Sequence, residues 1–163
     1  MSDGMALALI GAGLAVFLPG IGSSLGINIA SKSATAILSE KPERYGQFFI
    51  MVVLPGTQGF YGFLAGFMVM LKLNFFGGTG LSSIDFTLGL KVLIACLPVA
   101  IAGLVTAIYQ GKVASAGILM AGKRPEMAFK AGVVYAVMVE IYAILGLLAT
   151  LFMLLFGIKW PTV

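Results

Sequence analysis

The amino-acid sequence predicts an all-α membrane protein with four transmembrane helices, and two observations lead to this fold class. The 163 residues are 60% hydrophobic and only 10% charged, whereas a soluble domain is about 45–50% apolar and about 25% charged. The few charges also gather in short clusters, and the apolar runs between them are long enough to cross a membrane. These runs are continuously apolar rather than alternating, which favours helices over a β-barrel.

Four apolar runs predict the four helices, at about residues 5–38, 45–72, 86–121 and 128–157. Each run reaches the roughly 20 residues that a membrane-spanning helix needs, and the runs leave no room for a soluble domain. The first run has no basic segment before it and is too long for the apolar region of a signal peptide. It is therefore expected to remain in the protein as its first helix.

The polar turns after the first and third helices resemble one another. Lys41-Pro42-Glu43 matches Arg124-Pro125-Glu126 at an offset of 83 residues. The match favours a duplicated helical hairpin, with a first repeat at 1–82 and a second at 83–163. Two hairpins in the same orientation suggest rotational packing about the membrane normal, as in a homo-oligomeric ring. The alternative is a chance Pro-Glu pair in two polar turns.

Small residues recur along the first and third helices, at a spacing that allows membrane helices to approach closely. They are Gly11, Gly13, Gly20, Gly22 and Gly26 in the first helix and Ala95, Gly103, Ala107 and Gly111 in the third. We therefore expect these two helices to form a crowded inner layer of such a ring.

Basic residues are concentrated around the connections that follow the first and third helices, which predicts that both connections face the cytoplasm. These residues are Lys32, Lys41, Arg44, Lys112, Lys123, Arg124 and Lys130. Both termini and the glycine-rich middle connection, which begins Phe75-Phe-Gly-Gly-Thr-Gly, are expected on the opposite side. Trp160, beside Lys159, suits an anchor at the membrane interface.

The composition also excludes several kinds of active site. The chain contains no histidine, which is the usual metal ligand and the usual general base near neutral pH. Its one cysteine, Cys96, excludes an intramolecular disulfide and a CxxC motif. Ser–His and Cys–His catalysis are excluded as well, so we expect a protein that is not itself an enzyme.

Glu140 is the only acidic residue inside any of the four apolar runs. A carboxylate at the centre of a membrane helix costs about 2.5–3.5 kcal/mol on insertion scales, and such groups usually mark ion pathways or binding sites. The alternative is a protonated side chain that makes one interhelical hydrogen bond.

The spacing of other polar residues predicts that they lie at the same depth as Glu140. Glu140 follows Pro125 by fifteen residues, and Gln110 precedes it by fifteen. If the third and fourth helices run antiparallel around this turn, both side chains lie roughly 22 Å from it, near the middle of the membrane.

The first repeat places two more polar side chains at this depth. Thr57 follows Pro42 by fifteen residues, and Gln58 is next. Together with Gln110 and Glu140 they supply one carboxylate, two amide carbonyls and a hydroxyl. This set of hard oxygen ligands with a single charge favours Na⁺ over divalent or soft metals, and a proton carried on Glu140 is the simpler competitor.

Helix 2 contains Leu54-Pro-Gly-Thr-Gln-Gly, in which Pro55 removes a backbone donor and disturbs the preceding turn. A kink here can expose backbone carbonyl oxygens to a cation. It can equally be an ordinary kink of a membrane helix, because Pro19 and Pro98 occur in helices 1 and 3 without nearby charges.

Three motifs resemble one known family along essentially the whole chain. They are Leu54-Pro-Gly-Thr-Gln-Gly-Phe-Tyr-Gly, Gln110-Gly-Lys-Val-Ala and Met138-Val-Glu-Ile-Tyr-Ala-Ile-Leu-Gly. The chain resembles the proteolipid (c or K) subunit of V-type rotary ATPases, particularly the sodium-translocating bacterial kind. The resemblance implies a duplicated four-helix hairpin, assembled into a membrane rotor ring in the bacterial plasma membrane.

The resemblance also implies a role for each site residue. The Na⁺ ligands are expected to be the Leu54 backbone oxygen, Thr57, Gln58, Gln110 and Glu140, with Tyr61 closing the site through a hydrogen bond to the carboxylate. The expected partners are identical subunits, a stator subunit with a membrane arginine, central-stalk subunits at the loops near Pro42 and Pro125, and the lipid bilayer, but no nucleic acid. Na⁺ is expected as the transported ion, with no other cofactor.

The sequence leaves three alternative functions open. The first is a rotor subunit of the same type that carries H⁺. The second is a small self-contained channel or transporter that uses Glu140 as its gate or proton relay. The third is a structural membrane protein in which Glu140 only joins helices.

Overall fold

The computed structural model describes residues 2–76 and 84–160. Most of the expected glycine-rich connection, at 77–83, lies outside the described residues, together with the expected repeat boundary at 82/83 and the last residues of the tail, 161–163. The described residues contain helices and turns but no strand, which confirms the predicted all-α fold class.

Four helical segments in the described ranges are long and apolar enough to span a membrane, as predicted: Asp3–Leu38, Pro42–Lys72, Phe86–Lys123 and Ala128–Gly157. The first and third are the single α-helices α1 (Asp3–Leu38) and α4 (Phe86–Lys123). The second consists of η1 (Pro42–Arg44), α2 (Tyr45–Val53), η2 (Leu54–Gly56) and α3 (Thr57–Lys72), and the fourth of η3 (Ala128–Val133), α5 (Val134–Phe152) and η4 (Met153–Gly157).

The second and fourth segments are therefore not regular α-helices throughout. In the second, the 3₁₀ turn η2 contains Pro55, which has no backbone N–H to donate to the preceding turn. In the fourth, η3 and η4 are π-helical. Such deviations let a long membrane helix change direction without leaving the bilayer.

Side-chain caps begin α1 and α4 at the same end of the molecule. The Ser2 hydroxyl accepts a hydrogen bond from the Met5 amide at 3.3 Å, and the Asp85 carboxylate accepts one from the Leu88 amide at 3.3 Å. The Ser2 hydroxyl also donates to the Ile84 carbonyl at 3.0 Å, which joins the starts of the two helices.

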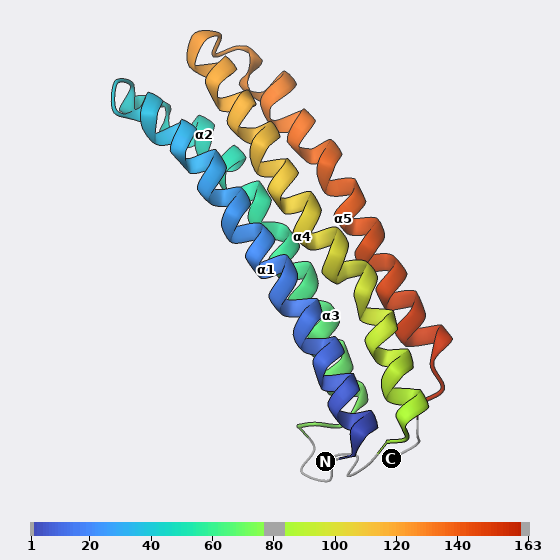
Figure 1. Cartoon of the computed structure of the whole chain (residues 1–163). Helices are drawn as coiled ribbons and strands as arrows, with labels where there is room; N and C mark the ends of the chain where they lie inside the picture. Colours follow the sequence, from blue (N-terminus) through green and yellow to red (C-terminus); the bar gives the residue numbers. More distant parts are fainter. Residues whose placement is uncertain (1, 77–83, 161–163) are drawn as a thin grey trace.

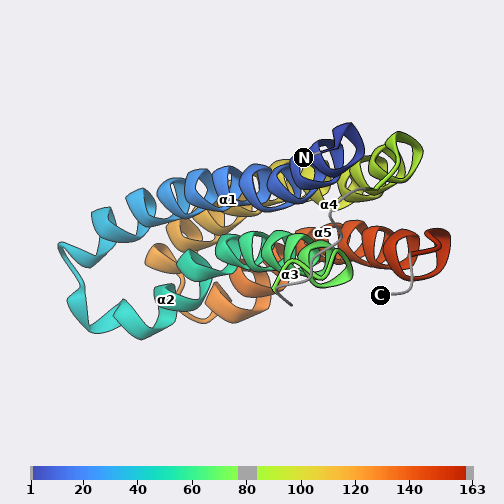
Figure 2. The same ribbon diagram turned by 90° about the horizontal axis from the view of Figure 1, so that it is seen from below.

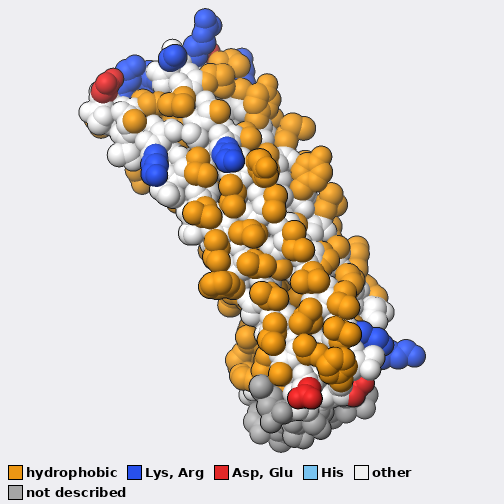
Figure 3. Space-filling view, viewed as in Figure 1, with side chains coloured by type: hydrophobic (Ala, Val, Ile, Leu, Met, Phe, Trp, Pro, Cys, Tyr) orange, Lys and Arg blue, Asp and Glu red, His pale blue; other side chains and the backbone are white. Residues whose placement is uncertain are grey.

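The helices form an elongated bundle whose two layers run along one direction (Figure 1). Seen from below, α1 and α4 lie side by side in one layer, and α3 and α5 lie in the other (Figure 2). Both termini lie at one end, and the turns after α1 and α4 lie at the other (Figure 1). On the face shown in Figure 3, charged side chains gather toward the two ends and hydrophobic side chains cover the middle, as a membrane-spanning bundle requires.

α1 and α4 make the most extensive contact in the bundle, and small residues permit it. Gly26 and Gly111 face each other where the two backbones cross: a Cβ atom on Gly111 would lie 2.5 Å from the Gly26 Cα. A Cβ atom on Gly26 would also lie 2.7 Å from the Pro55 Cβ. The same pair of glycines thus lets α4 and the 3₁₀ turn η2 reach α1 together.

We expect Gly111→Ala to destabilise the bundle by about 1–3 kcal/mol, because the added methyl group forces α1 and α4 apart. The measurement is the unfolding temperature of the purified chain in detergent. Gly20→Ala on α1 is the control, since a Cβ atom there meets nothing within 4 Å. An unchanged unfolding temperature for Gly111→Ala would mean that the close approach of the two helices contributes no stability.

Candidate functional site

The carboxylate of Glu140 on α5 lies inside the bundle, where it faces both α3 and α4. The side chain is only 9% exposed. Its Oε1 accepts a hydrogen bond from the Tyr61 hydroxyl on α3 at 2.5 Å, and its Oε2 accepts a longer one from the Gln110 amide on α4 at 3.4 Å. Three helices therefore meet at a single carboxylate.

Two fully buried glutamines continue this network toward η2. Gln58 Nε2 on α3 donates to Gln110 Oε1 at 2.6 Å, and Gln110 Nε2 donates to the Ala136 backbone carbonyl at 3.0 Å. The Ala136 carbonyl lies one helical turn before Glu140 on α5. Gln110 thus contacts α3 through its oxygen and α5 through its nitrogen, and it links these two helices, which lie in the layer opposite its own.

The last two polar groups lie where η2 meets α3. The Thr57 hydroxyl donates to the Leu54 backbone carbonyl at 2.9 Å, and it lies 3.4 Å from Gln58 Oε1. The Leu54 carbonyl also accepts the Thr57 backbone N–H, in the i to i+3 pattern of a 3₁₀ turn. The oxygens of Leu54, Thr57 and Gln58 therefore form one cluster at the start of α3.

The structure thus brings all six residues of the predicted site into one connected group: Leu54, Thr57, Gln58, Tyr61, Gln110 and Glu140. None of the six lies away from it. In the described part of the chain, no buried side-chain nitrogen or oxygen lacks a hydrogen-bond partner. The network is therefore internally satisfied in this arrangement.

The structure adds Ser23, a residue that sequence reasoning did not select. Its hydroxyl, on α1, accepts a hydrogen bond from the Gly59 backbone amide at 2.9 Å, next to Gln58. The bond fixes the first turn of α3 to α1. In the sequence, Ser23 differs from its neighbours only because it carries a hydroxyl group within the glycine-rich run of the first helix. This run lies opposite the segment that Pro55 disturbs.

The charge and ligand chemistry of the site suit one monovalent cation. Glu140 is the only formally charged residue among the six, and the other groups are neutral oxygens and amides. Carboxylate, amide, hydroxyl and backbone oxygens are hard ligands, which fit Na⁺ and do not fit the soft metals that prefer sulfur or imidazole. The described residues contain no group of three or more His, Cys, Asp or Glu side chains that could hold a metal ion of higher charge.

Comparison with known proteins gives consistent matches along the chain. A model of the ATP synthase C subunit family matches residues 10–69 and 93–153. The chain is 41% identical over 154 residues to V-type sodium ATPase subunit K of Enterococcus hirae, and the match covers 94% of each chain. It is 34% identical over 154 residues to A-type ATP synthase subunit K of Methanocaldococcus jannaschii, a match that covers 94% of this chain and 64% of that relative. All six site residues lie within the two ranges that match the family.

Proposed function

Because the chain belongs to the ATP synthase C subunit family, as a V-type proteolipid of the c/K kind, we propose that it carries Na⁺ across the membrane on Glu140. It is a rotor proteolipid of a rotary ATPase. In this proposal ATP is hydrolysed on other subunits, and the chain itself is not catalytic.

One observation carries the proposal: a single buried carboxylate lies in a network of neutral oxygen ligands. Glu140 supplies the one negative charge that a monovalent cation needs. The oxygens of Leu54, Thr57, Gln58 and Gln110 replace part of its hydration shell. In the present arrangement Gln110 Oε1 accepts a bond from Gln58 Nε2, so ion binding exchanges this hydrogen bond for a contact with the cation.

Charge neutralisation then explains how the site crosses lipid. Placing a charged carboxylate in the hydrocarbon region costs free energy, whereas a carboxylate with a bound Na⁺ is neutral overall. The neutral site can pass through the lipid-facing part of the rotation. An arginine on a stator subunit would then compete for Glu140 and release the ion.

The proposed assembly is a ring of identical subunits built from a duplicated hairpin, with repeats at 1–82 and 83–163. Three pairs of residues at an offset of 83 support the duplication: the helix caps Ser2 and Asp85, the turn prolines Pro42 and Pro125, and Thr57 opposite Glu140. The turns near Pro42 and Pro125 would contact central-stalk subunits on the cytoplasmic side. Both termini would then face away from the cytoplasm of a bacterial cell.

A rotor that carries H⁺ is the second candidate, and the Tyr61 contact is the observation that favours it. Tyr61 and Glu140 form the shortest bond to the carboxylate. A proton carrier needs little beyond a carboxyl group and one such partner. The buried amides of Gln58 and Gln110 have no role in that mechanism, and for this reason we prefer Na⁺.

Carbodiimide labelling of the assembled ATPase tests the choice between the two ions. The reagent modifies protonated carboxyl groups in apolar surroundings, so we expect it to label Glu140 and to spare the acidic residues outside the apolar runs. At a Na⁺ concentration about tenfold above Kd, labelling should fall about tenfold at neutral pH, because roughly one site in ten stays free.

Choline chloride at equal ionic strength is the control for salt effects, and Glu140→Gln is the control for the labelled position. If the labelling rate does not change with Na⁺ concentration but still depends on Glu140, the sodium assignment is overturned and the proton carrier is supported. Labelling that persists in Glu140→Gln would place the reactive carboxyl elsewhere.

A further inference from the structure

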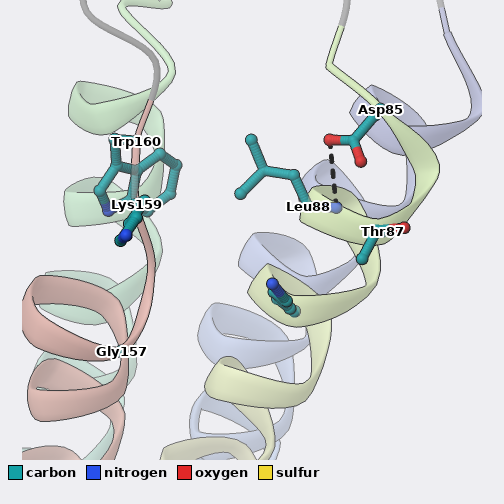
Figure 4. Close-up of a pocket in the computed structure, with 7 residues that line it drawn as sticks. Asp85, Thr87, Leu88, Gly157, Lys159 and Trp160 are labelled. Carbon is teal, nitrogen blue, oxygen red and sulfur yellow. Dashed lines mark hydrogen bonds between the residues drawn. The ribbon is translucent and has the colours of Figure 1, made fainter.

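A cavity of about 590 Å³ lies between the start of α4 and the end of η4, far along the bundle from Glu140. Figure 4 shows Asp85, Thr87 and Leu88 on the α4 side, and Gly157, Lys159 and Trp160 on the other. Lys91 completes the lining. The proposed transport mechanism uses none of these residues.

The charged groups of the cavity leave one net positive charge. Lys91 and Lys159 contribute two ammonium groups, and Asp85 contributes one carboxylate. That carboxylate accepts the Leu88 N–H as the cap of α4. Neither ammonium group has a carboxylate partner within residues 2–76 and 84–160, so both can contribute to binding a ligand.

One side of the cavity is held in place by contacts that Trp160 makes within the chain. The Trp160 indole N–H donates to the Leu154 carbonyl at 2.7 Å, and its ring packs on the buried core at this end. The indole therefore holds the chain over the end of η4, so that Lys159 stays opposite α4. Trp160 was expected as an interfacial anchor, and its internal bond gives it this second, structural role.

The cavity lies at the edge of the apolar part of the bundle. Lys91 immediately precedes the charge-free run 92–111, and Lys159 immediately follows the run 141–158. Beside the lining residues in sequence, Phe86 and Phe156 are 60% and 79% exposed. Cationic groups thus stand next to open apolar surface, at the level where lipid phosphates meet acyl chains.

We propose that this cavity binds the phosphodiester headgroup of an anionic phospholipid. A phosphodiester carries one negative charge, which matches the net charge of the lining, and its oxygens are acceptors for both ammonium groups. The acyl chains would lie on the apolar surface beside Phe86 and Phe156. This site is separate from the ion site and does not depend on which ion Glu140 carries.

Native mass spectrometry of the intact oligomer with added lipid tests this proposal. We expect phosphatidylglycerol, with its single negative charge, to be retained in preference to zwitterionic phosphatidylcholine. Lys91→Gln and Lys159→Gln should each weaken phosphatidylglycerol binding about fivefold, the effect of roughly 1 kcal/mol per lysine at an anionic membrane surface. Lys72→Gln, which removes the same charge at the same end but outside the cavity, should change binding less than twofold.

Several outcomes would overturn the proposal. Equal retention of the two lipids, or an equal loss in Lys72→Gln, would show that the cavity does not select a headgroup. Displacement of the ligand by millimolar inorganic phosphate would assign the site to free phosphate, because a lipid held also by its acyl chains should resist it. The mass of the oligomer in the same spectra shows whether each variant still assembles, and an assembled variant with full lipid binding would contradict the role of its lysine.

Discussion

Replacing Glu140 with Gln is expected to abolish Na⁺ transport by the assembled ATPase while the bundle stays folded. The amide has nearly the shape of the carboxylate, and its oxygen can still accept the bond from Tyr61. It has no charge, however, and so cannot neutralise the cation in a buried site. Losing the buried charge should weaken Na⁺ binding by about 3–5 kcal/mol, more than about a hundredfold.

The measurement is ATP-driven uptake of radioactive Na⁺ into vesicles that contain the complete ATPase. Asp3→Asn is the matched control, because it makes the same chemical change at an exposed position at the start of α1. The control should transport normally. Transport by Glu140→Gln at the level of the control would contradict the carrier role and leave Glu140 as a structural contact between α3, α4 and α5.

The depth of the site in the membrane could be predicted from the sequence, because each residue of an α-helix adds a fixed rise along the helix axis. Pro42 and Pro125 mark the two turns, and equal counts from them place Thr57, Gln110 and Glu140 at one level. The structure brings their side chains into one network. The identity of the transported ion was not predicted in the same way, because it depends on which atoms face the cation.

The partners within the network could not be predicted from spacing. Whether Gln110 turns its oxygen or its nitrogen toward Gln58 depends on rotamers and on the Ala136 carbonyl, which a residue count does not reveal. Ser23 was missed for a related reason. In a glycine-rich run a serine resembles one more small packing residue, and only the rotation of α1 about its axis turns the hydroxyl toward Gly59.

The shape of the second and fourth helices was predicted only in part. The 3₁₀ turn η2 lies at Pro55, whereas Pro19 and Pro98 lie inside unbroken α-helices, so a proline alone does not predict where a helix is interrupted. The π-helical turns η3 and η4 contain no proline. Apolar side chains are equally compatible with lipid in an α-helix and in a π-helix. Packing against α4 therefore decides which of the two forms at η3 and η4.

Replacing Gln58 with Leu is expected to separate sodium binding from the chemistry of Glu140. Leucine has about the volume of glutamine, so the fully buried position stays filled. The variant loses one amide oxygen that the proposal assigns to the cation. An interaction of this kind with a charged group contributes about 1.5–3 kcal/mol. The Na⁺ concentration that half-protects Glu140 from carbodiimide should therefore rise about 10- to 100-fold.

Labelling without Na⁺ should stay near its normal rate in this variant, because Tyr61 still contacts the carboxylate. Gln47→Leu is the matched control: its amide donates to the Pro125 carbonyl at the turn end of the bundle, far from the ion site. The contrast between the two glutamines distinguishes the two candidate ions. A proton carrier does not use the Gln58 oxygen, so an unchanged Na⁺ response in Gln58→Leu would remove this residue from the ligand set. A large shift in Gln58→Leu with none in Gln47→Leu is the result that only a cation bound between the amides and Glu140 explains.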